Sequence, residues 1–108
     1  MKRTGALKTY WGFIDQLKEG YPQDVALPID KLATLIIAFR AAFKLQDHHN
    51  ADLIAKRAMK VWEDGKLEYG LPNSVFESIV KKATDIVDAI DEDALNAIKN
   101  DAEDGVKC

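Results

Sequence analysis

The stretch Leu32–Leu45, LATLIIAFRAAFKL, is the longest apolar run in the chain. Only Thr34, Arg40 and Lys44 interrupt it, and its apolar side chains point to almost every side when it is wound as a helix. A helix of this kind is buried in the centre of a bundle or between subunits. The stretch therefore predicts a central helix over about residues 28–46. It is too short and too interrupted to cross a membrane, which takes about 20 mostly apolar residues.

Four further segments carry apolar residues at steps of three and four, which is the spacing of one helix face. They cover about residues 4–19, 50–64, 74–90 and 91–102. No segment shows the alternation of a strand, and the connections are short. The sequence therefore predicts an all-α fold, a single compact bundle of four or five helices around the central one. Residues 1–108 are expected to form one domain, with a polar, flexible tail from about residue 103.

Local signals suggest where these helices begin and end. Pro28 suits the first turn of the central helix, where its missing N–H is not needed. Asn50 and Asp91 are expected to be the N-caps of the third and fifth helices. Gly65 is expected to end the third helix. Ser74–Glu77 matches a capping box, in which serine caps the fourth helix and glutamate reaches back to the serine N–H.

Composition indicates an ordinary soluble protein, with 47% hydrophobic and 31% charged residues. The one cysteine, Cys108, is the last residue, so no internal disulfide can form and nothing points to an oxidising compartment. Lys8, Thr9 and Asp15 break the apolar run that a signal peptide would need. We therefore expect a cytoplasmic protein with no membrane association, most simply from a bacterium, a virus or a mobile element.

Charge is distributed unevenly along the chain. Residues 1–60 hold ten Lys or Arg and six Asp or Glu, a net of +4, whereas residues 61–108 hold five and twelve, a net of −7. The excess negative charge gives a predicted acidic partner-binding face: Asp85, Asp88, Asp91, Glu92 and Asp93. Such a face could meet a basic protein surface and steer the encounter. The alternative is that these charges serve solubility and the helix dipole.

A basic patch is the competing surface. Arg40 and Lys44 lie one turn apart on the central helix, and Lys56, Arg57 and Lys60 lie on the third helix. If the two helices pair antiparallel, Arg40 falls level with Lys56, and the five cations could contact nucleic-acid phosphates. The acidic pI of about 5.3 and the lack of interleaved exposed aromatics count against this function. The alternative is two solvated helix faces.

Catalytic and metal-binding patterns are weak. Asp47, His48 and His49, with Asp52 nearby, are the one candidate metal or acid–base cluster. Adjacent histidines in a turn point in different directions, so a solvated polar turn is the favoured interpretation, with no metal and no cofactor. No nucleophile elbow, phosphate-binding glycine loop or dinucleotide fingerprint occurs. We therefore do not expect an enzyme.

Two aromatic residues, Tyr21 and Tyr69, are expected in loops, where they could contact a partner. The favoured function is a small non-enzymatic protein-binding module, an adaptor or inhibitor that acts through a charged helical surface. A nucleic-acid-associated protein using the basic patch is the alternative, and a helical metal protein or enzyme at His48–His49 ranks third. A homo-oligomer fits each hypothesis, because the central helix can carry more apolar surface than one small bundle covers.

Overall fold

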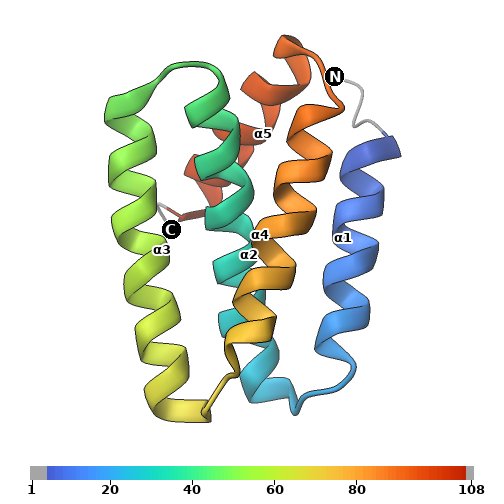
Figure 1. The fold of residues 1–108 in the computed structure, drawn as a ribbon, viewed down its shortest axis with the longest axis vertical. Helices are drawn as coiled ribbons and strands as arrows, with labels where there is room; N and C mark the ends of the chain where they lie inside the picture. Colours follow the sequence, from blue (N-terminus) through green and yellow to red (C-terminus); the bar gives the residue numbers. More distant parts are fainter. Residues whose placement is uncertain (1–4, 107–108) are drawn as a thin grey trace.

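The computed structural model describes the backbone of residues 5–106 and the side chains of residues 8–99. The helices of this range are α1 (Gly5–Lys18), α2 (Gln23–Lys44), α3 (His48–Tyr69), α4 (Asn73–Asp88) and α5 (Glu92–Val106). The first four lie side by side along the longest axis, and α5 lies behind α2 (Figure 1). Because α2 contacts each of the other four helices, the predicted all-α bundle around a central helix is confirmed.

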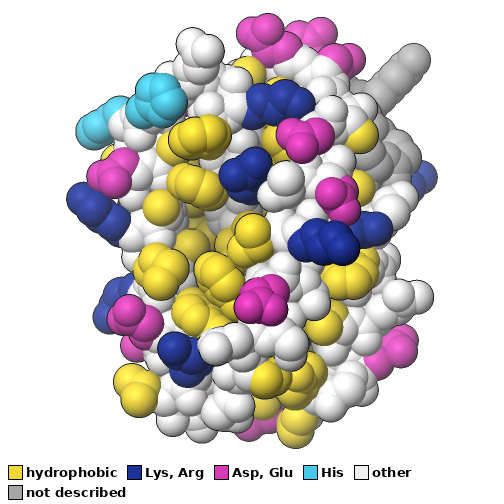
Figure 2. Space-filling view, in the orientation of Figure 1, with side chains coloured by type: hydrophobic (Ala, Val, Ile, Leu, Met, Phe, Trp, Pro, Cys, Tyr) yellow, Lys and Arg dark blue, Asp and Glu magenta, His cyan; other side chains and the backbone are white. Residues whose placement is uncertain are grey.

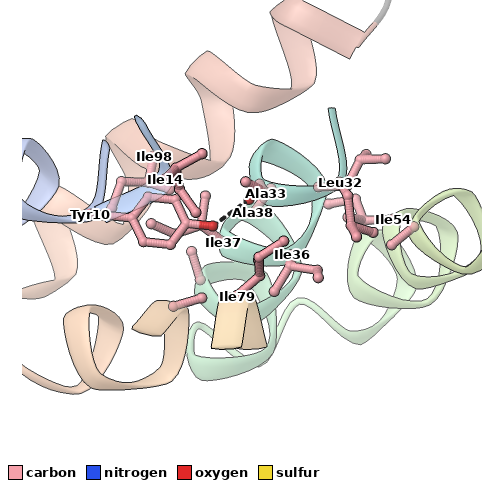
Figure 3. Close-up of a cluster of buried hydrophobic side chains, with 14 of the residues drawn as sticks. Tyr10, Ile14, Leu32, Ala33, Ile36, Ile37, Ala38, Ile54, Ile79 and Ile98 are labelled. Carbon is pink, nitrogen blue, oxygen red and sulfur yellow. Dashed lines mark hydrogen bonds between the residues drawn. The ribbon is translucent and has the colours of Figure 1, made fainter. Parts of the chain in front are cut away.

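The core forms around α2, which buries ten apolar side chains. Ile36 and Ile37 project from it toward different neighbours, and the side chains of α1, α3, α4 and α5 meet them (Figure 3). Apart from the aromatic residues Tyr10 and Trp62, the buried side chains of residues 8–99 carry no polar group. The one phenol at the centre, Tyr10, donates a hydrogen bond to the carbonyl oxygen of Ala33 (Figure 3). The hydrophobic effect is therefore the main stabilising contribution to this fold.

The central helix begins at Gln23, five residues before the predicted start. The carbonyl oxygen of Pro22 accepts from the backbone N–H groups of Val25 and Ala26, at 3.0 and 3.2 Å, and so closes the first turn. The segment predicted as a connection is thus the first part of α2. Pro28 is the sixth residue of the helix and lies beyond the first turn, so the prediction of its place was wrong.

The third helix begins earlier and ends later than predicted. Asp47 is the N-cap, because its carboxylate accepts from the backbone N–H and the side-chain amide of Asn50, at 3.5 and 2.8 Å. Gly65 does not end the helix. It is buried in α3, and a Cβ atom there would lie 3.1 Å from Leu71 Cδ1. The helix ends at Gly70, whose φ of 64° suits glycine.

One of the two N-caps predicted for α4 and α5 is present in the structure. No side-chain hydrogen bond caps α4, which begins at Asn73, so the predicted capping box of Ser74–Glu77 does not form. Asp91 does cap α5, since its Oδ1 accepts from the backbone N–H of Ala94 at 2.9 Å. α5 continues to Val106, past the predicted end near residue 102. The side chains from residue 100 onward and all of Cys108 lie outside the described part, so the predicted flexible tail stays a prediction.

No helix within the described range is long and apolar enough to span a membrane.

Candidate functional site

A groove runs between α3 and α4, over α2. Both helices pack on α2, and at one end they meet through the rings of Trp62 and Phe76, whose centroids are 5.1 Å apart. Beyond this bridge, a strip of hydrophobic side chains lies open between the two helices (Figure 2). The lower part of the strip is a cavity of about 270 Å³. Apart from Arg40, its lining is apolar, and it includes Ile36, Phe39, Ala58, Met59, Phe76 and Val80.

An adjoining cavity of about 390 Å³ continues the strip toward the turn between α2 and α3. It is more polar, and its lining includes Phe43, Lys44, His48, Val87 and Asp88. Arg40 lines both cavities, so the two lie next to each other with Arg40 between them. We call the two cavities together the α3–α4 groove.

Two large apolar side chains of this groove remain open to solvent. Phe43 is 50% exposed and Met59 is 46% exposed. The Phe43 ring is held between its neighbours, with centroids 6.0 Å from Phe39 and 5.8 Å from His48. The groove therefore presents partly ordered apolar surface to solvent. Surface of this kind, rimmed by charged groups, is typical of sites that bind another protein.

Arg40 is the charged group at the centre of the groove. Its Nε atom is buried and has no hydrogen-bond partner in the described structure. Its guanidinium carbon lies 5.9 Å from the centroid of the Phe43 ring. No ion pair joins Arg40 to another described side chain. A guanidinium that lies against an aromatic ring and makes no described ion pair can donate to an anionic or carbonyl oxygen of a ligand.

Two lysines of the predicted basic patch are paired with carboxylates of their own helix. On α3, Lys56 lies 3.1 Å from Asp52 and Lys60 lies 3.9 Å from Asp64, each pair one turn apart. Arg57 is exposed, and no ion pair links it to the described side chains. Pairing of the lysines with carboxylates lowers the local positive potential that phosphates would need. This arrangement gives no added support to the nucleic-acid hypothesis.

Lys44 joins the predicted basic and acidic surfaces. Its Nζ atom donates to the carbonyl oxygen of Val87 at 3.1 Å and lies 3.6 Å from a carboxylate oxygen of Asp88. Both partners belong to the last turn of α4, where a cation is favoured by the helix dipole. The two surfaces are therefore contiguous, and they meet at the upper end of the α3–α4 groove.

The acidic residues form two groups. Asp85 and Asp88 lie in the last turn of α4, whereas Asp91, Glu92 and Asp93 lie at the start of α5, and all five are exposed. The helix does not continue between residues 88 and 92, so the spacing that would align them on one helix face does not apply. Figure 2 shows acidic side chains gathered at the end of the molecule where α5 begins.

The two tyrosines expected in loops differ in their surroundings. Tyr21 lies between α1 and α2 and packs partly buried against the core. Tyr69 is the last residue of α3, not a loop residue, and is 37% exposed. It lines a second depression, of about 570 Å³, with Leu27 and several charged side chains of α2 and α3. Burial raises the pKa of Tyr69, and the charges of Glu68 and Asp24 act in the same direction.

The two histidines begin α3 and do not form the polar turn that was predicted. His48 contacts Phe43, and His49 is exposed. No group of three His, Cys, Asp or Glu within the described side chains could hold a metal ion. Asp47, beside them, pairs with Lys99 of α5 at 2.9 Å and caps α3. This carboxylate therefore joins two helices.

The groove was not predicted, although a signal for it exists in the sequence. Ala55, Met59 and Trp62 follow the spacing i, i+4, i+7 and form a second apolar stripe on α3. This stripe lies beside the one that packs on α2 through Ile54 and Ala58. A helix with two adjacent apolar stripes has more apolar surface than a single neighbour covers. Phe43 was counted only as part of the central apolar run.

Comparison of the chain with protein-family models, with curated proteins and with solved structures gave no match. The function of this protein is therefore inferred from its own geometry.

Proposed function

We propose that this protein is a small non-enzymatic protein-binding module that holds a partner protein in the α3–α4 groove. The observation that carries the proposal is the exposure of Phe43 and Met59 beside a nearly all-apolar cavity. Placing a partner there would remove these side chains from water, and burial of apolar surface drives most protein association. An adaptor or an inhibitor would use such a surface in the same way.

Charged groups around the groove supply a rim. Lys44 and Asp88 stand at its upper end as a pair, and the acidic residues of the α4–α5 turn lie beyond them. An apolar centre with a polar rim is the usual anatomy of a protein interface. The predicted charged surface thus contributes orientation and encounter rate in this proposal, while the apolar groove contributes most of the affinity.

Affinity capture with matched variants tests the proposal. Three proteins are immobilised: wild type, Met59→Glu and Leu67→Glu. Each is exposed to a lysate of the source organism, with and without nuclease. Leu67 is the control because it is 85% exposed, apolar and on the same helix, but outside the groove. We expect a protein retained by wild type and by Leu67→Glu, and lost with Met59→Glu.

Two results would overturn the proposal. Retention of the same proteins by Met59→Glu would show that the groove is not the binding surface. Partners that are lost after nuclease treatment would instead support the hypothesis of nucleic-acid binding through the basic residues. Circular dichroism and thermal unfolding of each variant check that the fold is kept, which we expect because Met59 already faces solvent.

A further inference from the structure

We infer that the occupant of the α3–α4 groove is an amphipathic helix of the partner that carries an aspartate or glutamate opposite Arg40. This inference rests on the proposed function and adds the chemistry of the partner. It starts from a contrast between the two cations that line the groove. Lys44 has the carboxylate of Asp88 within 4.0 Å, whereas no ion pair joins Arg40 to a described side chain.

Arg40 is held where a ligand would meet it. The residue lines both cavities, its guanidinium stands near the Phe43 ring, and its buried Nε has no acceptor. Because the Nε is buried, an incoming acceptor would meet the Nη groups at the end of the guanidinium, which make no hydrogen bond to the described residues. A carboxylate fits best, because it can accept two parallel N–H bonds from the guanidinium plane.

The groove carries one unpaired charge. Asp88 and Lys44 line the upper cavity together and offset each other at 3.6 Å, so Arg40 is left to attract an anionic group of the ligand. The lower cavity is apolar apart from Arg40, so the same ligand must also carry apolar side chains. A segment with a carboxylate close to apolar anchors meets both requirements.

Shape favours a helix over an extended segment. The groove walls, α3 and α4, are helices that run along the longest axis (Figure 1). Residues 5–106 contain no strand, so there is no sheet edge onto which an extended peptide could add. From His48 to Trp62, α3 covers 15 residues, and the 14 steps between the two ends rise about 21 Å at 1.5 Å per residue. A partner helix of about four turns has this length.

The order of the two cavities fixes the pattern of the partner helix. Apolar side chains at positions i and i+4 would enter the lower cavity, beside Met59 and Phe76. Arg40 stands at the junction with the upper cavity, so the carboxylate would lie one further turn along. The expected motif is two apolar residues four apart with Asp or Glu three or four residues from one of them.

The test is a selection from a displayed library of random 16-residue peptides against the purified full chain. Enriched peptides are synthesised, and their affinities are measured for wild type, Arg40→Met, Arg57→Met and Met59→Glu. Arg57→Met is the matched control, because it removes the same charge from an exposed position outside the groove. We expect the motif above, helix formation on binding, and affinity roughly ten- to a hundredfold weaker for Arg40→Met.

The outcomes separate the inference from the proposed function. Groove binding is supported if the peptides bind Met59→Glu more weakly than wild type. The inference is nevertheless overturned if these peptides lack a carboxylate, if they bind without forming a helix, or if Arg40→Met binds them as tightly as wild type does. Peptides that bind Met59→Glu as tightly as wild type would overturn both. A selection that enriches no peptide overturns the inference, and the lysate experiment still decides the function. Sedimentation showing a dimer that Met59→Glu dissociates would identify a second copy as the occupant and reject the partner helix.

Discussion

The hydroxyl of Tyr10 in α1 donates a hydrogen bond of 2.7 Å to the carbonyl oxygen of Ala33 in α2, and both residues are fully buried. A phenol without a partner at this depth would be costly, and burial accordingly raises the pKa of Tyr10 far above its usual value. The bond therefore fixes how α1 lies against the central helix. It also explains how a polar atom is accommodated at the centre of an apolar core.

Replacing Tyr10 by phenylalanine removes this bond and keeps the ring. We expect Tyr10→Phe to lower the free energy of unfolding by about 1 kcal/mol, the usual net value of one neutral hydrogen bond. Urea denaturation followed by circular dichroism measures it. Tyr21→Phe is the control, since the Tyr21 hydroxyl bonds to no described residue, and it should change the free energy by less than about 0.5 kcal/mol. Equal effects of the two variants would contradict the role of the Tyr10 bond.

Asp47 gives the protein an acid-sensitive contact. The hydrogen bond from Lys99, followed by that from Asn50, lowers the pKa of Asp47 from 3.8 to about 2. A carboxyl whose pKa is lower in the folded state stabilises the fold above its unfolded pKa, and this contribution is lost as pH falls toward the folded pKa. The stabilisation by Asp47 should therefore be complete above about pH 5 and fade between pH 5 and 2.

The comparison that isolates this effect is wild type against Asp47→Asn, because asparagine can still cap α3 but cannot pair as an ion with Lys99. We expect the variant to be less stable than wild type at pH 7, and the two free energies of unfolding to converge near pH 2. Lys99→Met should remove most of the same pH dependence from the wild-type protein. Parallel curves from pH 7 to pH 2 would contradict the assignment.

Gln46 occupies a position that favours glycine. Its φ is 62°, and it follows the end of α2. The N–H of Gln46 donates to the carbonyl oxygen of Phe43 at 3.0 Å, and the N–H of Asp47 donates to the carbonyl oxygen of Ala42 at 2.9 Å. These two hydrogen bonds form a Schellman motif. A side chain in this left-handed conformation costs about 1–2 kcal/mol, and glycine avoids it.

We therefore expect Gln46→Gly to raise the free energy of unfolding by about 0.5–1 kcal/mol, the gain being reduced by the greater freedom of glycine in the unfolded chain. Gly70→Ala is the converse, since Gly70 has a similar φ of 64° at the end of α3. That variant should lose about 1 kcal/mol. Thermal unfolding of both proteins gives the signs, and a Gln46→Gly variant less stable than wild type would refute the argument.

Periodicity was enough to predict a bundle of four or five helices, because each helix buries a face with the helical repeat, as Ile79 and Ala83 do on α4. The ends were less predictable, because a boundary depends on a few local contacts. Gly65 looks like a stop, but it continues α3 and gives room to Leu71. Ser74 looks like a cap, but the helix begins one residue earlier, directly after Pro72.

The groove was harder to predict, because it depends on how far apart two helices lie once they pack on a third. Arg40 and Lys56 were grouped from sequence spacing, yet the first stands in the groove and the second pairs with Asp52 on the outer face of α3. The contact between Asp47 and Lys99 joins residues 52 positions apart, and no local pattern encodes such a pair.

Pro28 is the sixth residue of α2, beyond the first turn in which a proline is tolerated without cost. It has no N–H, so the carbonyl oxygen of Asp24 lacks the donor four residues ahead, and the ring crowds that carbonyl. We expect Pro28→Ala to raise the free energy of unfolding by about 1–2 kcal/mol, part of the roughly 3 kcal/mol helix-interior penalty being offset because proline also restricts the unfolded chain.

The matched control is Pro22→Ala, since Pro22 lies at the N-cap of the same helix, where no N–H is required by the helical pattern. That variant should bring no gain. Urea denaturation of both variants and of wild type gives the free energies of unfolding, which show whether only the substitution at Pro28 is stabilising. If Pro28→Ala were less stable than wild type, the contacts that the ring makes in the depression beside Tyr69 would outweigh the restored backbone hydrogen bond, and the first part of α2 would be held by side-chain packing.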